Sequence, residues 1–149
     1  MATPDEARSD IYLALKTAWD AGASTTGKTL VYDNTTANIP TDEVGSTGEP
    51  NTWGAVRVVS NTSRVQSLVG AEGVRRYRRT GVVVVELYTP AGNGLVFADS
   101  VVKVVLDGLE GQTTANGVYF RDADVREEGV SGPWFLTVVT VNFEYDEVK

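Results

Sequence analysis

The chain contains neither cysteine nor histidine among its 149 residues. Without cysteine it can form no disulfide, no thiolate zinc site and no cysteine nucleophile. Without histidine it lacks imidazole metal ligands, imidazole proton shuttles, and the serine–histidine and cysteine–histidine pairs of many hydrolases. An enzyme built on this sequence would have to work with carboxylates, lysine or tyrosine. The composition therefore disfavours an enzyme, and we expect no catalytic residue, no metal site and no cofactor.

Long apolar runs and an excess of positive charge are also missing. No apolar stretch approaches the roughly 20 residues of a membrane span, and the start MATPDEARSD is too polar for a signal peptide. These features predict a cytoplasmic protein without membrane contact. The formal charge is −7, from 13 basic and 20 acidic side chains. Because phosphate contacts need basic patches, this balance argues against a general nucleic-acid binder, although an acidic surface tolerates DNA passing nearby.

The chain does have an ordinary globular composition and clear periodicity. With 42% apolar and 22% charged residues, residues 1–149 are expected to form one domain. Thr3, Pro4 and Glu6 form a pattern that starts a helix. From there apolar residues recur at helical spacing as far as Gly22, at Ile11, Tyr12, Ala14, Leu15, Ala18 and Trp19.

The next features are strand-like. A short strand is expected at Thr29–Asp33, followed by a polar loop at Asn34–Thr52 that is long for a compact domain. The loop should be mobile in an isolated subunit and become ordered on assembly, because it has few apolar residues to pack. A long hairpin, Trp53–Tyr88, follows, with the flap RVQSLVGAEGVRRY at 64–77. Its second arm carries the unbroken run Val82–Val85, which indicates a strand that lies centrally or is covered on both faces.

The last third of the chain predicts a helix and a second hairpin. Gly94–Leu109 has strand propensity, but its charged residues recur every four positions, which favours a helix ended by Gly108 and Gly111. The other side of that helix is apolar, through Leu95, Ala98, Val101, Val102, Val105 and Leu109. Gly117–Glu127 and Trp134–Tyr145 should pair as strands joined by the loop EEGVSGP. The order α-β-β-β-α-β-β predicts an α+β fold: an antiparallel or mixed sheet of about five strands, two helices packed on one face, and a long protruding hairpin.

Two patterns look like ligand sites. The segment Gly22–Thr29 matches the phosphate-loop pattern G-x-x-x-x-G-K-[ST] letter for letter. In a phosphate loop a strand enters the turn and a helix leaves it, so that the helix amides face the phosphate. Here the order is reversed, and we interpret the segment as a polar connection from helix to strand. The carboxylates of Asp122, Asp124, Glu127 and Glu128 could bind a hard cation or act as an acid–base pair, but an exposed strand face explains them more simply.

Four arginines, Arg75, Arg76, Arg78 and Arg79, crowd the returning arm of the long hairpin. They could be solvated charges that discourage edge-to-edge aggregation, a phosphate patch, or a docking surface for an acidic neighbour. Because acidic residues are abundant elsewhere, self-association would place this basic flap against an acidic surface of the next copy. In this interpretation the flap lies outside the helix–sheet core, so reversing two arginines should block assembly and leave folding intact.

Five short segments spread along the chain form a recognisable combination. They are VYDN from residue 31, the strand WGAVRV, the stretch Q-x-L-x-G-x-x-G-x-R-x-Y-R-R-x-G from Gln66 to Gly81, the turn Y-x-P-x-G-x-G from Tyr88 to Gly94, and the ending W-x-x-x-V-V-x-V-x-F-x-Y-D. Together they resemble the tail terminator, or tail completion, proteins of long-tailed bacteriophages. The resemblance covers nearly the whole chain.

The resemblance implies a small α+β structural subunit that forms a ring, hexameric in that family, at the head-proximal end of a phage tail tube. Such a ring stops tube polymerisation and provides the joint to the head connector. The implied location is the virion, with the host cytoplasm during assembly. The implied partners are further copies of the chain, the tail tube protein, the head–tail connector protein, and phage DNA that passes through the lumen without specific binding. The candidate contact residues are Gln66, Arg75, Arg76, Tyr77, Arg78, Arg79, Tyr88 and Pro90.

Two alternatives stay open at this point. The first is another neck or tail structural subunit, such as a head-completion or tail-tube protein. A tube subunit would polymerise into filaments, whereas a terminator stops at a closed ring. The second is a nucleotide-binding enzyme that uses the Gly22–Thr29 loop, which a nucleotide-binding assay would separate from both structural roles.

Overall fold

The computed structural model of the chain describes residues 2–34, 51–68 and 74–149. Along these residues lie two helices and five strands: α1 (Pro4–Ala21), β1 (Thr29–Tyr32), β2 (Trp53–Leu68), β3 (Arg75–Pro90), α2 (Leu95–Leu109), β4 (Tyr119–Ser131) and β5 (Trp134–Val148). The order α-β-β-β-α-β-β and the α+β class are those expected from the sequence. The long polar loop falls almost entirely outside the described residues, so its mobility stays a prediction.

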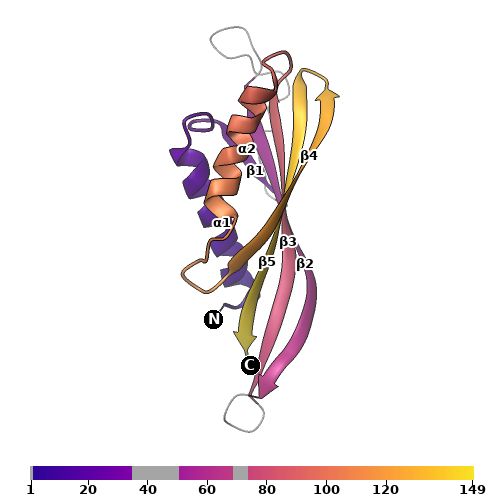
Figure 1. Cartoon of the computed structure of the whole chain (residues 1–149). Helices are drawn as coiled ribbons and strands as arrows, with labels where there is room; N and C mark the ends of the chain where they lie inside the picture. Colours follow the sequence, from indigo (N-terminus) through magenta and orange to yellow (C-terminus); the bar gives the residue numbers. More distant parts are fainter. Residues whose placement is uncertain (1, 35–50, 69–73) are drawn as a thin grey trace.

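The five strands form one mixed sheet in the order β1-β2-β3-β5-β4. β1 runs parallel to β2, and the three other neighbouring pairs are antiparallel. Both helices cover one face of the sheet, here called the helix face, and the opposite face is the helix-free face (Figure 1). β3 lies in the middle of the sheet, which confirms the interpretation of its valine run.

α1 begins and packs as its sequence predicts. The backbone N–H of Thr3 donates to the Glu6 carboxylate at 2.9 Å, and Pro4 occupies the first helical position, where no backbone donor is needed. Its buried residues recur every four positions, at Ala7, Ile11, Leu15 and Trp19. This single stripe turns one side of α1 toward the sheet.

α2 is helical although it is rich in valine. Its buried stripe consists of Ala98, Val101, Val102, Val105 and Leu109. Packing of this stripe outweighs the low helix propensity of β-branched residues. Two details differ from the expectation. Gly108 does not end the helix but lies inside it, where a Cβ atom would be 2.3 Å from the Cβ of Ala18, so the glycine lets α1 and α2 approach closely. Leu95 is exposed rather than buried, because it lies in the first turn of α2, to which the hydrophobic core does not extend.

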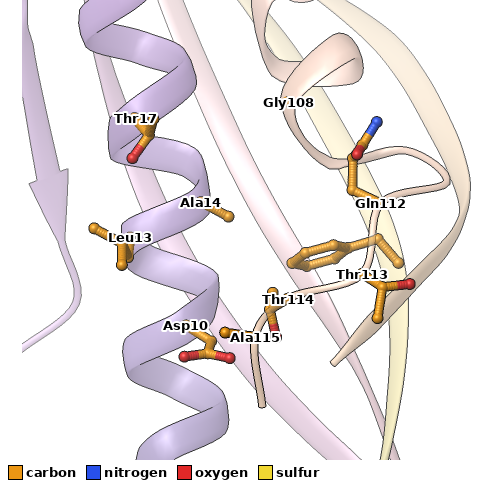
Figure 2. Close-up of a pocket in the computed structure, with 10 residues that line it drawn as sticks. Asp10, Leu13, Ala14, Thr17, Gly108, Gln112, Thr113, Thr114 and Ala115 are labelled. Carbon is orange, nitrogen blue, oxygen red and sulfur yellow. The ribbon is translucent and has the colours of Figure 1, made fainter. Parts of the chain in front are cut away.

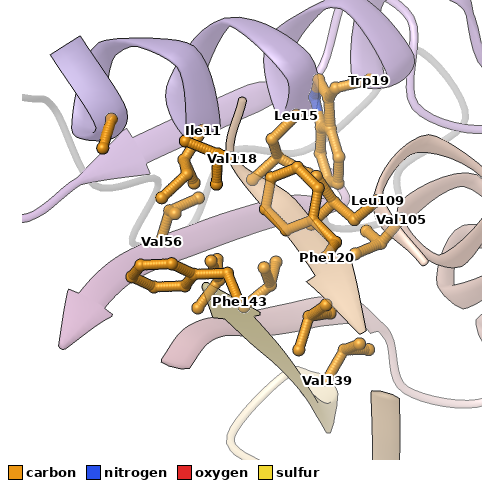
Figure 3. Close-up of a cluster of buried hydrophobic side chains, with 14 of the residues drawn as sticks. Ile11, Leu15, Trp19, Val56, Val105, Leu109, Val118, Phe120, Val139 and Phe143 are labelled. Atoms are coloured by element: carbon orange, nitrogen blue, oxygen red, sulfur yellow. The ribbon is translucent and has the colours of Figure 1, made fainter. Parts of the chain in front are cut away.

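The hydrophobic core fills the space between the helices and the helix face of the sheet (Figure 3). Alternate residues of the inner strands enter it: Val83, Val85 and Leu87 from β3, and Val139, Val141 and Phe143 from β5. Burial of an aliphatic or aromatic side chain of this size stabilises the fold by roughly 1.5–3 kcal/mol. A slip of one residue would turn this whole set to the other face, so the alternation determines which face of the sheet meets the helices.

The β4–β5 hairpin is longer than the sequence indicated. The segment expected as a loop continues β4 beyond a bulge between Glu127 and Gly129, where Gly129 has a φ of 100°. A two-residue turn, with Gly132 at a φ of 60°, then joins Ser131 to Trp134. At its other end β5 continues past Tyr145 to Val148, and this extension reaches the arginine-rich part of β3.

Candidate functional site

The four candidate arginines lie on β3 itself, not on a flap outside the sheet. β2 flanks them on one side and the end of β5 on the other, with Arg79 level with Tyr145. Strand alternation places Arg76 and Arg78 on the helix-free face, and Arg75 and Arg79 on the helix face. Because β3 is an inner strand, the arginines do not protect an edge of the sheet, and that interpretation is wrong.

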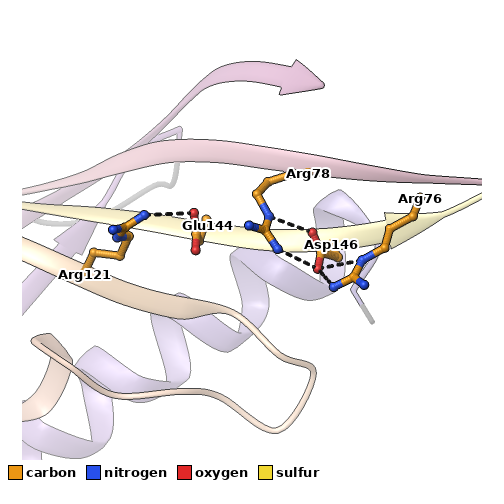
Figure 4. A network of polar contacts seen from close by, with 5 residues as sticks. All are labelled: Arg76, Arg78, Arg121, Glu144 and Asp146. Atoms are coloured by element: carbon orange, nitrogen blue, oxygen red, sulfur yellow. Dashed lines mark hydrogen bonds and ion pairs between the residues drawn. The ribbon is translucent and has the colours of Figure 1, made fainter. Parts of the chain in front are cut away.

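Asp146 of β5 holds two of these arginines (Figure 4). Its Oδ1 accepts a hydrogen bond from Nε of Arg78 at 3.0 Å, and its Oδ2 accepts one from Nε of Arg76 at 2.9 Å. A second nitrogen of each guanidinium, Nη2, also donates to Oδ2. The hydrogen bond from Arg78 lowers the pKa of Asp146 below its ordinary value; burial opposes the shift, and Arg76 adds to it. The hydrogen bond to Asp146 likewise raises the pKa of Arg78.

The end of β5 also neutralises Arg79. This guanidinium pairs with Glu147, and Nζ of Lys149 lies 4.0 Å from the same carboxylate. Lys149 Nζ is also 5.3 Å from the ring centre of Tyr77, which is a cation–π distance. Sequence reasoning missed these partners, although the acidic pair that follows Tyr145 in the last strand was a signal for them. Arg76, Arg78 and Arg79 are therefore held by carboxylates of their own chain.

Two arginines of this region keep an unpaired charge. Among the described residues, Arg64 on β2 and Arg75 on β3 have no carboxylate partner. Arg64 lies directly opposite Arg78, and like charges in that position repel each other. Arg64, Gln66 and Arg78 line a pocket of about 220 Å³ together with two threonines. This end of the helix-free face is therefore basic and polar, and suits an acidic partner.

Tyr88 and Pro90 lie at the other end of β3, so the eight candidate contact residues form two separate surfaces. The ring of Tyr88 stacks on Trp53 with ring centres 4.1 Å apart, and Trp134 meets both rings edge-on. The Tyr88 hydroxyl donates to Glu86 at 2.9 Å; burial, together with this hydrogen bond, raises the pKa of Tyr88 to about 12. Pro90 is buried and level with Trp134. Both residues are thus packed within the subunit.

Exposed apolar side chains surround the turn that follows Tyr88. Val96 in the first turn of α2 is 85% exposed, and Val130 near the tip of β4 is 72% exposed. The exposed Leu95 and Val130 and the half-buried Phe135 line a pocket of about 210 Å³ beside this turn. Grouped exposed aliphatic side chains are typical of protein contact surfaces. The sequence does not indicate this patch, because Leu95 falls on the apolar side of its helix and is therefore expected to be buried.

The segment Gly22–Thr29, which matches the phosphate-loop pattern, forms a turn that hydrogen bonds tie to the end of α1. α1 ends before it and β1 begins after it, so the expected order of helix, then strand, is confirmed. The Thr25 hydroxyl donates to the carbonyl of Trp19 at 2.6 Å, and the Trp19 indole N–H donates to the carbonyl of Lys28 at 3.0 Å. α1 presents its C-terminal end to this turn, and that end of a helix dipole disfavours an anion.

Lys28→Ala should therefore change stability by less than about 0.5 kcal/mol and leave nucleotide binding unaltered, since the residue contributes its backbone carbonyl to the fold. Calorimetric titration of the wild type and the variant with ATP and GTP provides the measurement. Saturable micromolar binding by the wild type that Lys28→Ala abolishes would show that this interpretation of the turn is wrong.

A pocket of about 290 Å³ lies between α1 and the connection that joins α2 to β4 (Figure 2). Asp10 is the charged residue among those that line it. Its carboxylate accepts hydrogen bonds from the backbone N–H and the side-chain amide of Asn116, at 3.0 and 2.9 Å. Burial by itself would raise the pKa of Asp10, but the hydrogen bonds from Thr114 and Asn116 outweigh it and lower the pKa. A carboxylate that is ionised and engaged in this way anchors the connection and is a poor proton donor.

The acidic residues of β4 are exposed, and the register places Asp124 and Glu127 on opposite faces of the strand. Asp122, Asp124 and Glu127 are exposed and have no ion pair among the described residues, whereas Glu128 pairs with Arg126. In the described part of the chain, no group of three or more His, Cys, Asp or Glu side chains is placed to hold a metal ion. We therefore keep the explanation that these carboxylates belong to a solvent-facing strand.

No protein-family model matches the chain, and no curated protein matches it. Nineteen chains of solved structures do match. One of them, whose name states no function, aligns over 100% of this chain and 97% of its own length, with a TM-score of 0.64 and 16% sequence identity. At this identity the likeness shows a shared fold and carries no statement about function. Neither α1 nor α2 combines the length and the apolar character that a membrane-crossing helix needs.

Proposed function

We propose that this chain is a structural subunit of a long-tailed bacteriophage that forms a ring, with six copies, at the head-proximal end of the tail tube. The ring would stop polymerisation of the tube and join it to the head connector. The proposal starts from the sequence segments that resemble tail terminator proteins. Four of these segments fall on the β2–β3 hairpin, the turn after Tyr88, and β5.

The observation that carries the proposal is the reach of β2 and β3 beyond the helices. Each strand is 16 residues long. In Figure 1 their far ends extend past the N-terminal end of α1, so neither described helix covers that part of the sheet. The part of a sheet that extends beyond its helix layer offers strand faces and an edge to other subunits.

The chemistry of the described surfaces supports contact rather than catalysis. Among the described residues, Arg64 and Arg75 at one end of the sheet have no carboxylate partner. The other end carries the exposed Val130, with the exposed Val96 on α2, and β4 carries exposed carboxylates. Surfaces of opposite charge on one chain favour association between copies. The net charge of −7 would let DNA pass through the lumen without being gripped.

Negative-stain electron microscopy of the purified protein, alone and mixed with its tail tube protein, tests the proposal. We expect closed rings from the protein alone, and tubes that carry a ring at one end and stop growing in the mixture. Open filaments from the protein alone would identify a tube subunit instead. Tubes of unchanged length in the mixture would overturn the terminator role.

A further inference from the structure

The sheet has two edges along which the described residues leave a strand unpaired. β1 pairs with β2 only along Trp53–Val56, so the outer edge of β2 beyond Arg57 has no described strand beside it. At the other side of the sheet, Thr113 bridges to Tyr119 at the start of β4, and the backbone of Phe120 exchanges hydrogen bonds with Gly111 and Gln112. Beyond Phe120 that outer edge is unpaired in the described chain. Long unpaired edges are templates for pairing with another chain.

Each of these edges has one regular stretch between two bulges. On β2 it is Thr62–Val65, and on β4 it is Ala123–Glu127. Bulges normally discourage pairing along an edge. The stretches between them keep the regular alternation that a partner strand needs, and each is about four or five residues long, which is near the usual length of a short strand.

The two stretches complement each other in charge. β2 presents Arg64, which has no carboxylate partner among the described residues and faces Arg78 across the strand pair. β4 presents Asp124, which is equally without an ion pair in the described chain. Both side chains lie on the helix-free face, because Arg64 is level with Arg78 and Asp124 with Thr140. An ion pair between them would relieve the repulsion at Arg64.

The two stretches also match in apolar surface and in direction. Val65 is 57% exposed and Val125 is 46% exposed, and both lie on the helix face. Three successive antiparallel pairs separate β2 from β4, so these two strands run in opposite directions. A second copy with its helices on the same side would therefore bring its β2 antiparallel to β4, which continues the alternation of the sheet.

We propose that β4 of one copy pairs with β2 of the next copy, with Asp124 opposite Arg64, so that one sheet continues through the assembly. In this register Ser63 lies opposite Val125, and Val65 lies diagonal to Val125, within reach of contact. The proposal deepens the proposed function, on which it rests for the biological role of the assembly, by naming the strands that join the subunits.

This contact is head-to-tail, since two different edges meet, so it propagates from copy to copy and closes only if the rotation allows. Arg64 is level with Arg78 of β3, whereas Asp124 is level with Val84. Neighbouring copies are therefore offset along the strands by the distance between Arg78 and Val84 on β3, which is roughly 20 Å at about 3.4 Å per residue. An offset of this kind tilts the strands relative to the axis of a closed sheet, as in barrels.

Because the chain has no cysteine, introduced cysteines can trap the contact without background. The variant with both Ser63→Cys and Val125→Cys should form a covalent ladder of oligomers under mild oxidation. Each single-cysteine variant should stay uncrosslinked, and an equal mixture of the two should stop at covalent dimers. Dimers of one single-cysteine variant alone would indicate a symmetric contact and overturn the proposal.

Charge reversal gives an independent readout. Arg64→Glu and Asp124→Arg should each weaken assembly about tenfold, measured by sedimentation or mass photometry. The double variant should assemble as the wild type does, because each head-to-tail contact regains one charge of each sign. Lys16→Glu, an exposed charge reversal on α1, serves as the control and should leave assembly unchanged.

The outcomes separate this proposal from the proposed function. Rings that form without a cysteine ladder and without charge rescue would overturn the strand pairing and leave the ring itself intact. A ladder and rescue in a protein that does not alter tube length would support the pairing and remove the terminator role. A wild type that stays monomeric at all concentrations would overturn the pairing.

Discussion

Replacing Trp19 with alanine is expected to lower the free energy of unfolding by about 3–5 kcal/mol. The indole is fully buried between α1 and the sheet, and a Cβ atom added at Gly54 of β2 would lie 3.1 Å from it. Its N–H also donates to the carbonyl of Lys28, which ties the turn after α1 to the helix. The substitution would therefore open a cavity and leave that carbonyl without its donor. Urea denaturation followed by circular dichroism gives the measurement.

A matched control lies on the same helix. Leu13 is 65% exposed, so Leu13→Ala should change the free energy of unfolding by no more than about 0.5 kcal/mol. Trp19→Phe should fall between the two, because it keeps most of the apolar volume and loses the hydrogen bond. If Trp19→Ala and Leu13→Ala unfold at the same urea concentration, the packing of α1 on the sheet is not as described.

The double variant Arg76→Glu with Arg78→Glu is expected to lose about 1–3 kcal/mol of stability. The Asp146 side chain is only 14% exposed and receives its hydrogen bonds from these two guanidinium groups. The variant would replace both donors with carboxylates and place three negative charges together. The arginine side chains are about 40% exposed, and for this reason the expected loss is smaller than for a fully buried pair. Thermal unfolding should shift down by about 2–4 °C for each kcal/mol.

The pH dependence of stability should change sign in this variant. In the wild type the pKa of Asp146 is below its ordinary value of 3.8, so its contribution is present above that pH and is lost as the pH falls further. In the variant, neighbouring carboxylates raise the pKa of Asp146, so acidification should relieve repulsion and recover stability. Unfolding curves between pH 7 and pH 3 distinguish the two, and parallel curves would show that Asp146 is not coupled to these residues.

Arg75→Glu is the control that separates docking from folding. Arg75 is exposed and unpaired among the described residues, so its reversal should leave stability within about 0.5 kcal/mol of the wild type. A loss of assembly in this variant would therefore report a contact between subunits. The same loss in the Arg76 and Arg78 double variant would not, because the reversal acts first on the subunit's own sheet.

The sequence by itself determined the elements that follow from local periodicity. The pattern Thr3-Pro4-x-Glu6 and the apolar stripe of α1 identify a helix without reference to the rest of the chain. Charges at four-residue spacing predict α2 in spite of its valines, and the alternation of apolar residues predicts β5. The reversed order around Gly22–Thr29 also needed only the neighbouring elements. Each of these inferences depends on residues within about one turn or one strand of each other, where spacing alone decides which side chains share a face.

Only the tertiary structure decided which segments meet. Arg78 and Asp146 are 68 positions apart, and their contact depends on β5 lying beside β3. Gly108 reads as a helix terminator in the sequence, but its place inside α2 follows from the close approach of α1. The sequence indicates Tyr88 as a contact residue, and only the structure places its ring against Trp53 and Trp134. Periodicity reports how much of an element is buried and on which side, whereas strand order and register are set by packing between distant elements, which no local spacing encodes.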